Sequence, residues 1–170
     1  MTPEFARLER VDTFGEGERV VVIAADEGER AKLARRFGLI AVARLEARFA
    51  VRREGAAVLA TGRVEAAVTQ ACSVSGEPIE ARVDEAVSLR FVEGDDAGEE
   101  VELGEGDLDT LPIEAGAIDL GEAAAETMAL ALDPFPKIAG AEEALRAAGV
   151  LGDEGGNAFS ALAKLRDQLR

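Results

Sequence analysis

Cys72 is the one residue of this 170-residue sequence whose side chain could form a covalent bond as a thiolate. It ends a predicted strand and precedes a turn that contains Gly76 and Pro78. A reactive thiolate usually needs a nearby base, cation or helix N-terminus, and no such group adjoins Cys72 in the sequence. We therefore expect a structural thiol at a strand end, whose replacement by Ser or Ala leaves function largely intact. A metal site shared between two subunits remains the alternative.

The absence of histidine removes most other chemistry from consideration. Catalytic triads, cysteine–histidine pairs and histidine-containing zinc sites all need that side chain. Carboxylates could still hold a divalent metal in a nuclease, but their spacing does not require it, and the EF-hand pattern is missing. We therefore predict a protein that is not an enzyme and has no cofactor and no metal. The carboxylates considered for the nuclease alternative are Asp107, Asp109, Glu114 and Asp119.

Seven basic residues are the strongest candidates for binding, because arginine and lysine side chains suit phosphate groups. Three lie on a predicted helix and four on or just after the next predicted strand, so packing of the two elements would create one positive patch. The alternative is a solvated face that is partly neutralised by Glu29, Glu46 and Glu54. The predicted RNA-binding residues are Lys32, Arg35, Arg36, Arg44, Arg48, Arg52 and Arg53.

The formal net charge of −15 is divided unevenly along the chain. Residues 1–70 hold 12 basic and 11 acidic residues, a net of +1, so the remaining 7 and 23 give residues 71–170 a net of −16. Such a field repels nucleic acid at long range and attracts basic partners, although solubility also explains an acidic surface. Two kinds of binding partner therefore remain open: RNA at the basic residues, and basic proteins at the acidic half of the chain.

The elements that position these residues begin with a strand and a helix over residues 20–38. A β-branched run at residues 18–25 predicts a buried strand. Asp26 and Glu29 have the spacing of a capping box, and Gly38 is a suitable helix end. Three alternating stretches at residues 42–55, 57–72 and 79–92, joined by short turns, then predict an antiparallel meander. Gly62, inside the second stretch, predicts a bulge or a tight bend.

Helices and loops are predicted for the rest of the chain. Residues 93–109, rich in acids and glycine, predict a flexible loop, and Asp119 or Gly121 begins a helix that ends before "DPFPK". Residues 152–157 predict a linker to an amphipathic C-terminal helix. The whole sequence therefore predicts a single α+β domain over residues 1–170. It is expected to have an antiparallel, strongly curved sheet, with a partial barrel as an option, one helix after the first strand and C-terminal helices.

The location and assembly of the protein are only partly indicated. No apolar run is long enough to span a membrane, and the N-terminus lacks the apolar segment of a secretory signal. One cysteine is typical of a reducing compartment, so we predict a cytoplasmic protein with no membrane partner. The sequence does not indicate the oligomeric state.

Two segments resemble motifs of the YceD family, the large ribosomal RNA subunit accumulation proteins. In "TQACSVSGEPIEARVDEAVSLRF", Cys72, Pro78 and Phe91 fill the family pattern of a cysteine, a proline and a strand that ends near a phenylalanine. "IDLGEAAAETMALALDPFPKIAGAE" is similar to the family's D-L-x-E helix and the proline-rich segment after it, although Ala139 stands where proline is usual. The tail "NAFSALAKLRDQLR" resembles the ending of alphaproteobacterial members. The motif residues of the proline-rich segment are Asp133, Pro134, Phe135 and Pro136.

The resemblance implies a cytoplasmic bacterial protein that is needed for normal accumulation of large-subunit ribosomal RNA, but it implies no defined mechanism. Other branches carry a cysteine-rich C-terminal segment that this chain lacks, so no zinc is implied. A non-enzymatic factor in large-subunit biogenesis, with large-subunit ribosomal RNA or ribosomal proteins as partners, is the leading hypothesis. The alternative is an acidic protein-binding module that does not touch RNA, with Phe135 as an exposed anchor.

Overall fold

A computed structural model describes residues 3–93 and 109–149, and every structural statement below concerns these residues. The predicted loop over 93–109 lies outside them except for its two end residues, and the predicted linker at 152–157 and C-terminal helix lie outside them entirely. The described residues divide into two compact units, residues 3–70 with 80–93 and 109–134, and residues 71–79 with 135–149. The expectation of a single domain stays a prediction.

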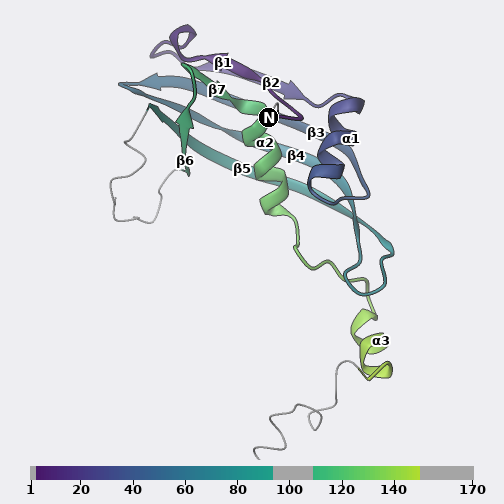
Figure 1. The fold of residues 1–170 in the computed structure, drawn as a ribbon. Helices are drawn as coiled ribbons and strands as arrows, with labels where there is room; N and C mark the ends of the chain where they lie inside the picture. Colours follow the sequence, from purple (N-terminus) through teal and green to yellow (C-terminus); the bar gives the residue numbers. More distant parts are fainter. Residues whose placement is uncertain (1–2, 94–108, 150–170) are drawn as a thin grey trace, which may run out of the picture. The chain divides into compact units, whose positions relative to one another are not determined.

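A five-stranded sheet forms most of the first unit (Figure 1). Its strands lie in the order β2-β3-β4-β5-β6, and β3 is antiparallel to both β2 and β4. The last strand, β6, is parallel to β5. The bounds are β2 (Arg19–Ala24), β3 (Ala41–Glu54), β4 (Ala57–Ala71), β5 (Pro78–Glu93) and β6 (Asp109–Ile113).

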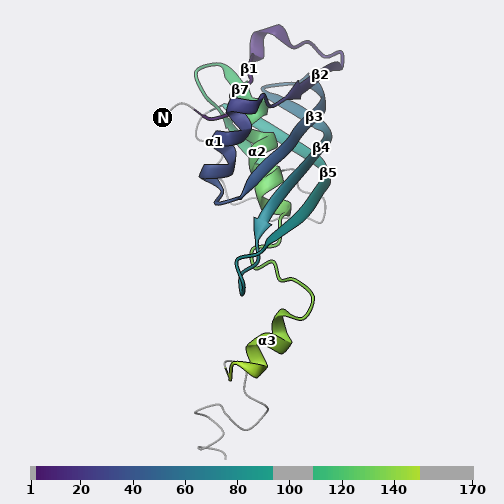
Figure 2. The ribbon, with the colours of Figure 1, turned by 90° about the vertical axis from the view of Figure 1, so that its right-hand side faces the viewer.

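Two short strands and the helices complete the described structure. Strand β1 (Leu8–Arg10) pairs antiparallel with β7 (Ala117–Asp119) in a separate two-stranded sheet. A 3-10 turn, η1 (Val11–Thr13), follows β1. Helices α1 (Glu27–Arg36) and α2 (Leu120–Ala131) lie on the same side of the five-stranded sheet (Figure 2). Helix α3 (Ala141–Ala147) belongs to the second unit.

The predicted fold class is wrong. The larger sheet is mixed and open, neither antiparallel throughout nor strongly curved, it forms no barrel, and strands outweigh helices in the structure. The difference arises at β6, because the sequence predicted no sheet strand at residues 109–113. A parallel neighbour needs a long connection, and the segment between β5 and β6 provides one. The strand–helix pair over 20–38 and the three long strands are confirmed.

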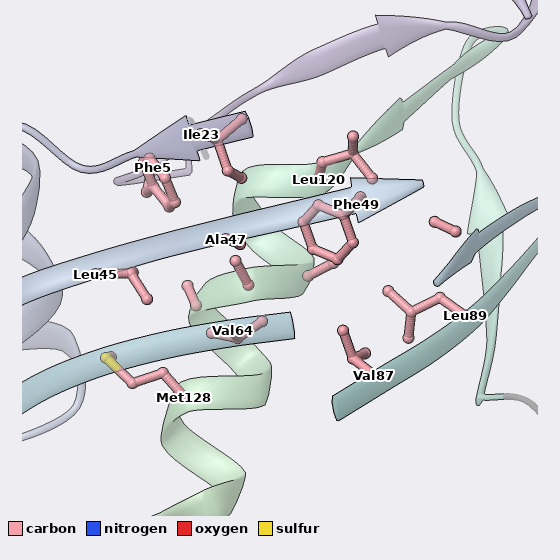
Figure 3. Packing of buried hydrophobic residues seen from close by; sticks show 14 of the residues in the cluster. Phe5, Ile23, Leu45, Ala47, Phe49, Val64, Val87, Leu89, Leu120 and Met128 are labelled. Atoms are coloured by element: carbon pink, nitrogen blue, oxygen red, sulfur yellow. The ribbon is translucent and has the colours of Figure 1, made fainter. Parts of the chain in front are cut away.

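The hydrophobic core lies between one face of the five-stranded sheet and α2. Figure 3 shows Phe49 of β3, Val64 of β4 and Leu89 of β5 around the helix. Leu120 and Met128 of α2 are completely buried against them. Each large apolar side chain buried in this way contributes about 1.5–3 kcal/mol to folding. Alternation along the strands leaves the polar side chains on the opposite, outer face.

Two glycines permit backbones to approach closely. Gly62 lies opposite Phe49 in an unbroken register, and a Cβ atom there would lie 2.0 Å from the carbonyl oxygen of Arg48. The predicted bulge at Gly62 is therefore wrong, and the register shift occurs between Val42 and Arg44. A Cβ atom on Gly121 would lie 2.0 Å from the carbonyl oxygen of Phe5. The N-terminal segment thus packs directly on the first turn of α2.

Candidate functional site: the cysteine turn and the basic faces

The turn that follows β4 is closed by its own backbone. The N–H of Cys72 donates to the carbonyl of Glu77 at 2.8 Å, and the N–H of Gly76 donates to the carbonyl of Cys72 at 2.8 Å. Gly76 has φ +75°, a conformation that favours glycine over residues with a side chain. The hydroxyl of Ser75 donates to a carboxylate oxygen of Glu77 at 2.9 Å. We call residues 72–77 the cysteine turn.

The cysteine turn is bonded to the proline-rich segment that follows α2. Within the second unit, the N–H of Ser73 donates to the carbonyl of Pro136 at 2.8 Å. Within the first unit, the side-chain amide of Gln70 donates to the carbonyl of Asp133 at 2.9 Å, and Gln70 is buried. The two motifs that carry the family resemblance are therefore held together by hydrogen bonds, although they lie far apart in the sequence.

The thiol of Cys72 is buried, and its pKa is lowered. Polar contacts from the side chain and backbone of Ser75, and from the backbone of Ile138 and Val74, lower the pKa of Cys72 to about 6, because they favour the thiolate. The sequence did not predict this lowered pKa, because no cation adjoins Cys72 and the groups that lower its pKa belong to its own turn and to Ile138. The serine and glycine in "CSVSG" were the available sign.

The D-L-x-E segment has structural roles. A carboxylate oxygen of Asp119 accepts hydrogen bonds from the N–H groups of Gly121 and Glu122 at 3.0 Å each, so Asp119 is the N-cap of α2. The same oxygen accepts the N–H of Arg7 at 2.8 Å, which fixes the N-terminal segment. Leu120 is completely buried in the core. Glu122 forms two hydrogen bonds with Arg36 of α1, at 2.8 and 2.5 Å.

The predicted basic residues on α1 differ in their surroundings. Arg36 contacts Glu122 and also Glu4, at 3.1 Å, and these acidic partners raise the pKa of Arg36. Lys32 and Arg35 line a shallow pocket beside Glu4 and make no ion pair among the described residues. Arg36 is therefore engaged in joining two helices and the N-terminal segment, which leaves Lys32 and Arg35 as the more available cations of this helix.

Of the predicted basic residues on β3, Arg44, Arg48 and Arg52 lie on the outer face of the sheet, whereas Arg53 follows the alternation of the inner face at the end of the strand. Arg44 pairs with Glu46 at 2.8 Å and Glu65 at 2.9 Å, and Arg52 pairs with Glu54 at 3.4 Å. The side chain of Arg53 donates a hydrogen bond to the carbonyl oxygen of Gly55 at 3.2 Å. Four of the seven predicted residues thus have ion-pair or hydrogen-bond partners within the described part of the chain: Arg36, Arg44, Arg52 and Arg53.

Arg48 differs from its neighbours on β3. It lies on the outer face between Val22 of β2 and Arg63 of β4, and it makes no ion pair among the residues that the structure describes. Arg63 is paired with Asp84. Helix α1 contributes Leu33 to the core on the inner face, so the sheet separates the α1 cations from Arg44, Arg48 and Arg52. The structure does not bring the seven residues into one patch.

The structure also bears on the alternative hypotheses of a metal site, a nuclease and an exposed phenylalanine anchor. Within residues 3–93 and 109–149, no three cysteine or acidic side chains are arranged to hold a metal ion. Of the carboxylates considered for a nuclease, Asp119 is occupied as the helix cap and Asp107 lies outside the described residues. Phe135, predicted to be an exposed anchor, is 71% exposed. In the same part of the chain, no helix is long and apolar enough to cross a membrane.

These features define a mixed-sheet protein whose cysteine turn and proline-rich segment act as one structural feature. The family model described as "Large ribosomal RNA subunit accumulation protein YceD" matches residues 60–166, which include both motifs. The chain belongs to the YceD family, whose name implies a role in the accumulation of large-subunit ribosomal RNA. Comparisons with curated proteins and with solved structures gave no match.

Proposed function

We propose that this protein is a non-enzymatic binding factor in the biogenesis of the large ribosomal subunit and that it acts in the cytoplasm. The observation that carries the proposal is the family match over residues 60–166, in which the two matched motifs are joined by the Ser73–Pro136 hydrogen bond. A rigid turn of this kind suits recognition, because a preorganised surface loses little conformational entropy on binding.

The outer face of β3 and β4 supports a contact with RNA phosphate. Arg48 lies directly opposite Arg63, whose charge is already paired with Asp84, and Arg48 itself makes no ion pair among the described residues. A phosphate group beside Arg48 would accept hydrogen bonds from its guanidinium group. The acidic remainder of the chain opposes non-specific binding to nucleic acid, so this contact depends on a defined position in the RNA.

Depletion of the protein in its own host tests this function. The ratio of large-subunit to small-subunit ribosomal RNA is expected to fall, and expression of the full chain from a second copy is expected to restore it. A chain with Arg48→Glu is expected to restore the ratio less well. An unchanged ratio after complete depletion would remove the proposed role in RNA accumulation.

A further inference from the structure

A groove of about 440 Å³ lies in the first unit and is lined by residues of β1, β5, β6, β7 and α2. Its apolar lining includes Leu8, Leu111, Pro112 and Ala117. Leu8 is 69% exposed, so part of the apolar lining of the groove is open to solvent. We call this feature the β6–α2 groove; its strands and helix are labelled in Figure 1.

The charges that the described residues bring to the groove are all negative. Among these residues, four carboxylates line it and no lysine or arginine does. Asp119 and Glu122 are already engaged, as the cap of α2 and as the partner of Arg36. Glu114 and Glu126 are exposed and make neither an ion pair nor a side-chain hydrogen bond with any described residue. As far as the chain is described, the groove therefore combines an apolar lining with two carboxylates that have no cationic partner.

We infer that the β6–α2 groove binds a basic protein segment that carries apolar side chains between its lysines or arginines. The apolar side chains of such a segment would cover Leu8 and Leu111, while its cations would pair with Glu114 and Glu126. RNA is excluded as the occupant, because its phosphates would meet only carboxylates. We take this segment to belong to a basic ribosomal protein of the large subunit. In this one respect the inference rests on the proposed function.

Binding of a defined probe to the full chain tests the groove. The probe is a fluorescent peptide of alternating lysine and leucine, and its companion has serine in place of each leucine. Fluorescence anisotropy gives the affinity of each peptide for the chain and for the double variant Glu114→Gln/Glu126→Gln. The matched control is Glu16→Gln/Glu18→Gln, which removes the same charge from two exposed positions outside the groove.

We expect the groove double variant to bind the lysine–leucine peptide about tenfold more weakly and the control to change affinity by less than about twofold. We also expect Leu8→Ser to weaken binding of this peptide but not of the lysine–serine peptide. Equal losses in the two double variants would show attraction by net charge alone and would overturn the inference. So would an unchanged affinity in Leu8→Ser.

The same experiments separate this inference from the proposed function. Peptide binding that depends on the groove, together with an unchanged ribosomal RNA ratio on depletion, would refute the role in RNA accumulation and leave the groove as a protein-binding site. Loss of ribosomal RNA on depletion, with no groove-dependent peptide binding, would refute the groove alone.

Discussion

The backbone N–H of Ser73 donates a 2.8 Å hydrogen bond to the carbonyl oxygen of Pro136. This bond joins the turn after β4 to the segment after α2, and each of these segments contains one of the two family motifs. Backbone bonds do not depend on the identity of the side chains, so the surrounding residues must make the geometry possible. Gly76 supplies the left-handed turn, and the prolines end the helix and direct the chain.

The first prediction concerns the ionisation of Cys72. Because hydrogen bonds from Ser75 and its neighbours favour the thiolate, Cys72 should titrate with a pKa of about 6. The ultraviolet absorbance of the thiolate, followed against pH, measures this directly. Ser75→Ala should move the midpoint upward, and Cys72→Ser should abolish the absorbance change. A midpoint close to that of a free cysteine in the unsubstituted chain would contradict this account of the turn.

The same ionisation predicts how stability depends on pH. The pKa of Cys72 is lower in the folded chain than its ordinary value of 9.0, so the thiolate stabilises the fold above that ordinary value. This contribution declines as the pH falls from about 9 to about 6 and is absent below the folded pKa. Urea unfolding of the chain and of Cys72→Ser should show a stability difference that changes across this window. A constant difference would count against a thiolate in the folded state.

Gly121→Ala should destabilise the protein by about 1–3 kcal/mol, because the added methyl group would meet the carbonyl oxygen of Phe5. Thermal or urea unfolding measures the change. Gly17→Ala is the matched control, since a Cβ atom at Gly17 has no neighbour within 4 Å. The control should be neutral or slightly stabilising. Equal effects of the two substitutions would show that the N-terminal segment does not pack against α2.

Arg36 and Glu122 should stabilise the protein as a pair. Their side chains are 31% and 25% exposed, so we expect a coupling energy of about 0.5–1 kcal/mol. A double-mutant cycle with Arg36→Gln and Glu122→Gln measures this coupling in unfolding experiments. Additive effects would mean that the pair contributes nothing. Because Arg36 has this structural role, we also expect its replacement to lower the free energy of unfolding while leaving the affinity for RNA nearly unchanged.

Arg48 should contribute to RNA binding more than its paired neighbours. Arg48→Glu is expected to weaken the affinity for large-subunit ribosomal RNA about tenfold and to reduce the slope of affinity against salt by about one. Arg10→Glu, which removes the same charge from β1, is the control and should have little effect. Filter binding over a range of salt concentrations measures both quantities. If the two variants behave alike, Arg48 is not a specific phosphate contact.

Much of the fold could be predicted because the alternation in β3, β4 and β5 reflects one buried and one exposed face. The capping box formed by Asp26 and Glu29 is confirmed. It could be predicted because its two residues lie close together in the sequence. Strand β6 could not be assigned, because its parallel partner is chosen by tertiary packing across a long connection. Strands β1 and β7 have only three residues each and carry no usable periodicity.

The candidate site was less predictable because its properties depend on contacts between distant residues. The ion pair of Arg36 with Glu122 joins α1 to α2, and no local pattern indicates it. The division of the basic residues between two sides of the sheet likewise follows from the packing of α1 on the core. The lowered pKa of Cys72 arises partly inside its own turn and partly from Ile138, which lies in the other motif.

Ultraviolet crosslinking in living cells tests the role in large-subunit biogenesis most directly. A tagged copy of the full chain is crosslinked, its bound RNA is sequenced, and the bound particles are sedimented. We predict reads concentrated in one region of large-subunit ribosomal RNA, in particles lighter than the mature subunit. Recovery of proteins with no enrichment of large-subunit RNA over an untagged control would contradict the proposed contact with RNA.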